Sequence, residues 1–178
     1  PTRQNIADLL IAADLSIRTL EVDLLRLVHE RLVISESDLR CPHQRLAAVL
    51  LGRLLQHQDN AGRAAISTML KAIFADSTLP LAGLSALLHE LRFTDYGRWK
   101  DLISKSTLEP VLDRCWSASD PEERTRACFL LNEAVFYIDT WERDVIGDND
   151  KKLARWIENA VDPMGHGLKW LLNTLLNQ

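Results

Sequence analysis

The stretch DPEERTRACFLLNEAVFYIDTWERDVI, residues 120–146, carries the strongest helix signals in the chain. Asp120 is a good N-cap because its carboxylate can accept the free amide protons of the first turn, and Pro121 falls where a missing N–H costs nothing. Apolar residues then occupy one helical face and much of the remaining surface. They are Ala127, Cys128, Phe129, Leu130, Leu131, Ala134, Val135, Phe136, Tyr137, Ile138 and Trp141. A surface helix keeps a polar face, so the sequence predicts a central helix over 120–146 that neighbours cover on several sides.

The rest of the chain repeats the helical spacing in shorter segments. Leucine accounts for 32 of the 178 residues while β-branched residues are sparse, which favours helix over strand. Start signals and leucine stripes predict helices over 2–32 (whole, or broken near Asp14), 42–58, 60–74, 81–91, 95–104, 106–116, from about 149 to Pro163, and 164–177. Strict alternation is absent from the sequence, so no strand is predicted, and residues 35–40 are expected to form a turn or a single helical turn.

These segments predict an all-α fold of eight to ten helices with short polar connections. Two architectures fit: a compact bundle around residues 120–146, or a short stack of helix pairs of the HEAT or armadillo kind. The length of 178 residues predicts a single domain over 1–178, with a soft division near 76–79. Hydrophobic residues at 47% and charged residues at 26% exclude wholesale disorder.

Charge and cysteine usage narrow the classes of partner and compartment. The net charge is −4, and no basic stripe of the kind that holds duplex nucleic acid is visible in the sequence. No apolar run is long enough to span a membrane. Three cysteines without a CxxC pair argue against a disulfide framework. The sequence therefore predicts a soluble protein of a reducing compartment, cytoplasmic or nuclear, with no membrane partner.

Motifs for metal, phosphate or nucleophilic chemistry are incomplete throughout. His29-Glu30 and His89-Glu90 begin like the zinc motif HExxH, but the second histidine is missing in both cases. The acidic run at 148–150 lacks the later calcium ligands, and the glycines at 165–167 lack a Walker lysine. Cys115 and Cys128 fall on apolar faces, where a thiol is commonly a small hydrophobe, and Cys41 has no base facing it. The sequence therefore predicts no catalytic residue, metal or cofactor.

Two groups of residues are candidates for contact with a partner protein. Tyr96, Arg98, Trp99 and Lys100 share a predicted short helix, and an aromatic residue with arginine is the composition of interface hot spots. For the tryptophan, packing in the core is the preferred interpretation. The second group is the acidic series at the end of the predicted central helix, which could dock a basic surface. It consists of Asp139, Glu142 and Asp144, followed by Asp148 and Asp150.

The predicted function is that of a non-enzymatic interaction or regulatory module. A groove between leucine-striped helices could hold an amphipathic helix of a partner protein. A small-ligand or enzymatic domain, with a pocket built from scattered positions, is the alternative. A nucleic-acid-binding solenoid is a second alternative, against which the charge balance argues. Homo-oligomers through an apolar helix face are left open by the sequence.

Overall fold

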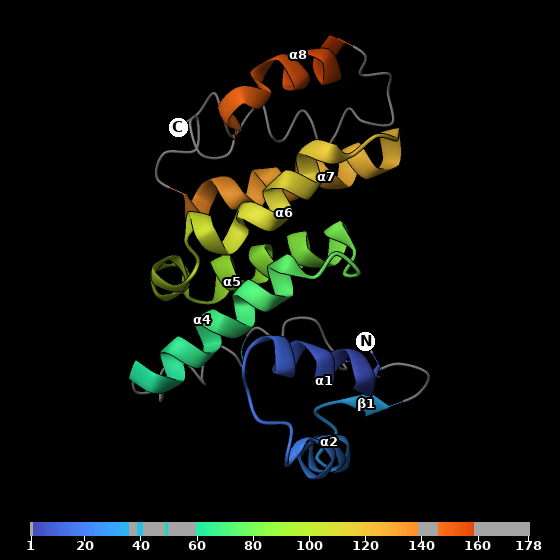
Figure 1. Ribbon diagram of the computed structural model, residues 1–178, viewed down its shortest axis with the longest axis vertical. Helices are drawn as coiled ribbons and strands as arrows, with labels where there is room; N and C mark the ends of the chain where they lie inside the picture. Colours follow the sequence, from blue (N-terminus) through green and yellow to red (C-terminus); the bar gives the residue numbers. More distant parts are fainter. Residues whose placement is uncertain (1, 36–38, 41–48, 50–59, 139–145, 159–178) are drawn as a thin grey trace. The chain divides into compact units, whose positions relative to one another are not determined.

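The computed structural model describes residues 2–35, 39–40, 49, 60–138 and 146–158, with the backbone alone at 40, 94–96, 98, 147 and 157–158. The predicted all-α class is confirmed, because helices make up most of the described chain (Figure 1). None of the described helices combines the length and the apolar character that crossing a membrane would require. Two compact units are present, Pro1–Ile73 (unit 1) and Phe74–Gln178 (unit 2). The sequence placed a soft division close by, at 76–79; whether the chain is one domain stays a prediction.

Unit 1 begins with two short helices, α1 (Arg3–Ala12) and α2 (Leu20–His29), so the break expected near Asp14 is present. Both helices end in the same way. Asp14 and Arg31 follow the C-caps with φ of 54° and 59°, in the left-handed region. After α1, the amide of Leu15 donates to the carbonyl of Leu10 at 2.8 Å, and that of Asp14 to Ile11 at 3.0 Å. This is the Schellman arrangement, in which glycine is the usual left-handed residue.

The remaining described part of unit 1 contains a feature that the sequence did not predict. Strands β1 (Ile34–Ser35) and β2 (Leu39–Arg40) pair antiparallel, with Ile34 opposite Arg40. The ends of the segment 35–40, which was expected to be a turn, therefore belong to a two-residue ladder, and residues 36–38 lie outside the described chain. Helix α4 (Asn60–Ala75) confirms the helix predicted over 60–74 and carries the boundary between the units. The helices predicted over 42–58 and 164–177 lie outside the described residues.

In unit 2, α5 (Leu81–Leu102) is one 22-residue helix. The prediction of two helices, over 81–91 and 95–104, is wrong. Thr94 and Asp95 resemble a helix start, but Leu91 before them and Trp99 after them are both 0% exposed. Burial of both residues against the same core keeps the helix continuous, because packing overrides a local capping preference.

Helix α6 (Lys105–Ser117) follows after a short connection and is close to the predicted segment 106–116. Ser104 and Thr107 form a capping box at its start. Such a box satisfies amide groups that the first helical turn leaves without intrahelical partners. The guanidinium of Arg114 on α6 donates to the carbonyl of Leu79 at 2.5 Å, which ties the helix to the segment before α5.

Helix α7 (Pro121–Ala134) begins as the sequence predicts. The Asp120 carboxylate accepts from the amides of Glu122 and Glu123, at 3.0 and 2.9 Å. The predicted extent to residue 146 is wrong: the α-helix ends at Ala134 and tightens into the 3-10 turn η1 (Val135–Tyr137). Valine, phenylalanine and tyrosine in succession are weaker helix formers, and a terminal turn often tightens in this way. After residues 139–145, which are not described, come the 3-10 turn η3 (Gly147–Asn149) and α8 (Asp150–Glu158).

The described core of unit 2 centres on α7. This helix packs against α5 and α6, beside which it lies in Figure 1. Its seven buried residues fall on several faces, as the sequence predicted, and include the polar Asn132 and Glu133. The hydroxyl of Tyr137 donates to the carbonyl of Leu88 at 2.8 Å, which fixes η1 against α5. Trp116 on α6 and Trp156 on α8 stack with ring centroids 5.3 Å apart.

Candidate functional site

A buried carboxylate marks the contact between α5 and α7. The side chain of Glu133 on α7 is only 8% exposed. Its Oε1 lies 3.0 Å from Nδ1 of His89, and its Oε2 lies 3.4 Å from Nη2 of Arg92. A carboxylate taken out of water is costly unless it is paired and hydrogen bonded, and here Oε1 is hydrogen bonded to His89 while Arg92 supplies an opposite charge.

One helix supplies both partners of Glu133. His89 and Arg92 are three residues apart on α5, and residues at this spacing share a helical face. Neither is as deeply buried as the carboxylate: the histidine side chain is 47% exposed and the arginine side chain is 20% exposed. The charge of Glu133 is therefore neutralised from the side that faces outward, and the basic groups separate it from solvent.

Aromatic rings surround the basic groups. The guanidinium carbon of Arg92 lies 3.8 Å from the ring centroid of Phe136 and 5.1 Å from that of Phe93, both within the range of cation–π attraction. The rings of His89 and Phe93 are tilted by 50° with centroids 4.7 Å apart. We call His89, Arg92, Phe93, Glu133 and Phe136 the α5–α7 cluster.

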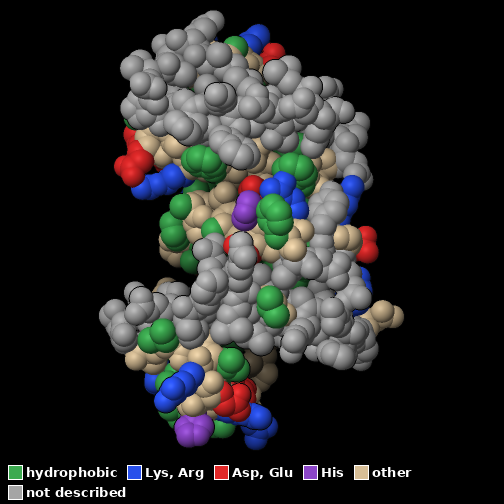
Figure 2. All heavy atoms as spheres, turned by 180° about the vertical axis from the view of Figure 1, so that it is seen from behind, with side chains coloured by type: hydrophobic (Ala, Val, Ile, Leu, Met, Phe, Trp, Pro, Cys, Tyr) green, Lys and Arg blue, Asp and Glu red, His purple; other side chains and the backbone are tan. Residues whose placement is uncertain are grey.

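The outer side of the α5–α7 cluster is apolar as well as basic. Phe93 is 71% exposed, the largest exposed fraction among the large hydrophobic side chains of the described chain. Phe129, one turn before Glu133 on α7, is 39% exposed. Figure 2 shows a histidine side chain with basic and hydrophobic side chains beside it on one face. Exposed aromatic rings next to an arginine held in place by a buried carboxylate match the composition of interface hot spots.

The α5–α7 cluster also contains half of a catalytic arrangement. A carboxylate that accepts from Nδ1 of a histidine orients the ring and leaves Nε2 facing outward, as in base–orienter pairs. Neither Nε of Arg92 nor Oε2 of Glu133 has a hydrogen-bond partner among the described residues, although both atoms are buried. A histidine base needs a nucleophile to deprotonate. The thiols of unit 2 do not supply one, because they are buried and protonated. No group of three or more potential metal ligands occurs in the described ranges.

The two thiols lie in the core of unit 2, on α6 and α7. Cys115 and Cys128 are both 0% exposed. Burial raises the pKa of Cys115 far above its ordinary value, and burial raises the pKa of Cys128 to about 12. Each thiol is therefore a small hydrophobe at neutral pH, which agrees with the reading of their apolar faces. Cys41 lies outside the described residues.

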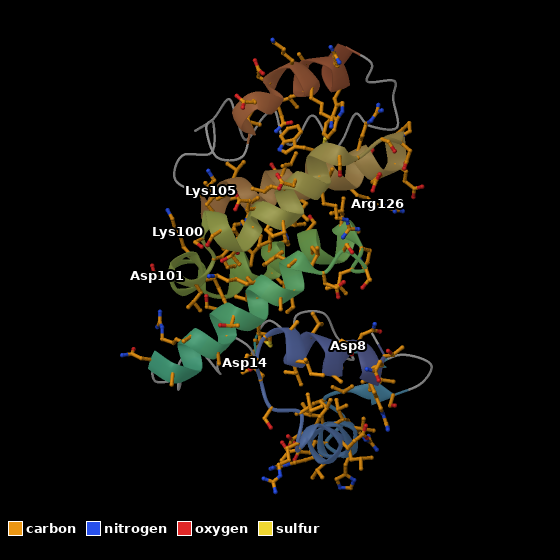
Figure 3. The ribbon with its side chains drawn as sticks, viewed as in Figure 1. Asp8, Asp14, Lys100, Asp101, Lys105 and Arg126 are labelled. Carbon is orange, nitrogen blue, oxygen red and sulfur yellow. The ribbon has the colours of Figure 1, made fainter. Side chains whose placement is uncertain are left out.

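The first predicted partner-binding group is divided by the structure. Trp99 is 0% exposed and packs in the core, which is the interpretation that the sequence favoured; its Nε1 has no hydrogen-bond partner within the described chain. Lys100 is half-buried, and the side chains of Tyr96 and Arg98 are not described. Figure 3 shows Lys100 and Asp101 projecting outward at the end of α5. Partner binding by this group stays a prediction, to which a buried tryptophan can contribute only from beneath the surface.

Two members of the predicted acidic series, Asp148 and Asp150, lie in the part of the chain that the structure describes. Asp139, Glu142 and Asp144 lie outside the described residues. Asp148 is exposed in η3, and Asp150 is the first residue of α8, so these two belong to the start of a new helix. Carboxylates at a helix N-terminus are favoured by the dipole, which gives them a local structural reason. Docking of a basic partner by the series is untested.

The sequence contains no signal for the α5–α7 cluster as a unit. His89 belongs only to half of a zinc motif, in which Phe93 occupies the position of the second histidine. Glu133 lies 44 residues further along, inside an apolar run. A charged residue in the middle of LLNEAVF is the one available sign, because a carboxylate in a buried helix needs a partner from elsewhere.

Comparison with protein-family models, with curated proteins and with solved structures finds no match for the chain.

Proposed function

We propose that the chain is a non-enzymatic protein-interaction module and that its docking surface is the outer side of the α5–α7 cluster together with Phe129. The observation that carries the proposal is Phe93, whose ring is 71% exposed while it contacts His89 and Arg92. Covering such a ring removes apolar area from water, and that gain favours association.

Preorganisation supports the same surface. Glu133 holds His89 and Arg92, and these side chains in turn hold the ring of Phe93. Side chains that are ordered before binding lose less conformational entropy when a partner arrives. An exposed ring on a fixed base is therefore a better anchor than the exposed Val22 and Leu25 of α2, for which the described residues provide no such support.

The test compares two pairs of deletions of exposed apolar side chains. Phe93→Ala/Phe129→Ala removes the rings of the docking surface, and Val22→Ala/Leu25→Ala removes similar exposure from α2 as the control. Proteins retained from native extract by the intact chain would be identified, purified and titrated by calorimetry. We expect the first variant to weaken binding at least about tenfold and the control to bind normally. A purified partner whose affinity is the same for both variants would contradict the proposal.

The His89–Glu133 pair favours a second candidate, an enzyme or ligand-binding site in which His89 acts as a base. His89→Gln keeps a polar group but removes the base. If this candidate is correct, a small molecule that raises the melting temperature of the intact chain should fail to do so with the variant. A partner protein that binds His89→Gln within about threefold of the intact chain would favour the interaction module instead.

A further inference from the structure

We infer that the exposed face of α5 takes a second copy of this chain, the two α5 helices packing antiparallel about a two-fold axis near position 95. The inference rests on the proposed function, since it names the partner for Phe93 and the face around it. A two-fold interface uses the same patch on both copies, so the patch must be complementary to itself.

The face has the spacing of a helix-pairing seam. Ala86, Glu90, Phe93, Gly97 and Lys100 follow one another at intervals of four, three, four and three residues. This alternation is the one that keeps side chains facing a neighbouring helix. The opposite side of α5 is filled with core residues of unit 2. They are Leu81, Leu84, Leu88, Leu91 and Trp99.

The bulky ring of Phe93 is matched by a residue without a side chain, Gly97, four positions later. A Cβ added at Gly97 would meet no atom of the described residues within 4 Å, so the described packing does not require glycine there. Glycine is the poorest helix former after proline, and the described part of unit 2 offers no packing reason for one inside α5. In an antiparallel pair centred on position 95, Phe93 of one copy faces Gly97 of the other, twice over.

Charged residues are also arranged so that opposite signs face each other about position 95. With Phe93 opposite Gly97, His89 faces Asp101 and Glu90 faces Lys100, so both flanking pairs combine basic with acidic residues. A parallel pair would set each residue opposite its own copy, acid against acid and base against base, which is unfavourable. His89 and Asp101 are both exposed. Glu90 and Lys100 are half-buried, and both of them, like His89 with Glu133, also make contacts within their own chain, so the argument depends chiefly on Phe93 with Gly97.

The length of the face sets the expected strength. From residue 86 to the end of α5 at residue 102 the helix rises about 24 Å, which is short for a stable interface, so a weak and reversible dimer is expected. Sedimentation of the full chain should therefore be measured up to about 1 mM, where association with a dissociation constant of micromolar order is complete.

Five variants of the full chain test the pairing, each checked for an unchanged melting temperature. Phe93→Ala removes the ring, and Gly97→Gln places a side chain where the ring of the second copy would lie; a Cβ at this position meets no described atom of its own chain within 4 Å. Gly83→Gln is the matched control, because Gly83 is an exposed glycine of the same helix beyond the paired stretch. Glu90→Lys/Lys100→Glu exchanges the charges and restores opposite signs across the axis, whereas Glu90→Lys alone does not.

We expect the intact chain, Gly83→Gln and the charge exchange to dimerise alike. Phe93→Ala, Gly97→Gln and Glu90→Lys should each weaken dimerisation at least about tenfold. A chain that is monomeric at about 1 mM overturns the inference, and so does a dimer that tolerates both Phe93→Ala and Gly97→Gln. Loss with Phe93→Ala but not with Gly97→Gln overturns the antiparallel register.

Failure here is distinguishable from failure of the proposed function. In one outcome the chain is monomeric, while a different, purified partner binds it and is lost from Phe93→Ala/Phe129→Ala. That result supports the interaction module and refutes only the second copy as its partner. A monomeric chain whose purified partners bind that variant normally refutes both.

Discussion

Glu133 combines deep burial with two basic neighbours, and at the scale of single residues this makes it the most sensitive polar position described. Deleting one member of a buried pair leaves the other charge without compensation, which costs more than the pair contributes. We therefore predict that Glu133→Ala lowers the free energy of unfolding by about 2–3 kcal/mol. Urea denaturation measures the change.

The control for Glu133 is on the same helix. Glu122 pairs with Arg126 four residues later, but its side chain is 77% exposed. Exposed pairs contribute little, so Glu122→Ala should cost less than about 1 kcal/mol. Equal costs for the two variants would mean that Glu133 is not held as a buried ion. In the double variant Arg92→Met/Glu133→Gln the loss should be smaller than the sum of the single losses, because the two side chains share one interaction.

At the scale of elements, the sequence predicts helix starts better than helix ends. Asp120-Pro121 specifies the start of α7 through its own side chains, so the signal is local and the prediction is correct. The end at Ala134 and the continuity of α5 depend on what packs against them. Thr94 and Asp95 are residue types that often begin a helix, yet Leu91 before them and Trp99 after them are both buried. The contact of His89 and Arg92 with Glu133 joins residues more than 40 positions apart, which no local pattern encodes.

The buried thiols on the apolar faces of α6 and α7 predict that the stability of the fold depends on pH. In the unfolded chain Cys115 and Cys128 ionise near the ordinary pKa of 9.0, whereas in the folded chain burial raises the pKa of Cys115 further still and that of Cys128 to about 12. Above pH 9 the unfolded state therefore binds fewer protons than the folded state, and stability falls as pH rises. The loss approaches about 1.4 kcal/mol per pH unit for each thiol.

Lysines and tyrosines titrate in the same pH range, so the contribution of the thiols to stability is measured as the difference between the intact chain and a variant without them. Cys115→Ala/Cys128→Ala removes both thiols and should be less stable than the intact chain at pH 7.5, owing to lost packing. That deficit should shrink by pH 10, since the variant has no buried thiols to keep protonated. Unfolding free energies in urea at the two pH values decide the matter, and a deficit that is unchanged or larger at pH 10 contradicts the assignment.

At the scale of the whole molecule, the described apolar core is unequally divided between the two units. In unit 1 the buried hydrophobic residues are Ala13, Leu24, Leu39 and Leu70, while Ile11, Val22 and Leu25 are more than half exposed. Unit 2 contains the larger set, including all of the buried tryptophans. Local opening follows the density of buried contacts, so amides of α1 and α2 should exchange with solvent faster than those of α5, α6 and α7.

The helix ends of unit 1 provide a way to ask whether the units unfold together. Asp14 and Arg31 occupy left-handed positions that glycine adopts without steric cost, so Asp14→Gly/Arg31→Gly should stabilise unit 1 by about 1 kcal/mol in total. If the units open independently, hydrogen exchange will slow in α1 and α2 and stay unchanged in α7. If the chain is one cooperative domain, as the sequence predicts, the slowest amides of α7 will gain the same protection, because they exchange only through global unfolding. Faster exchange in α1 would instead show that the two side chains stabilise their turns.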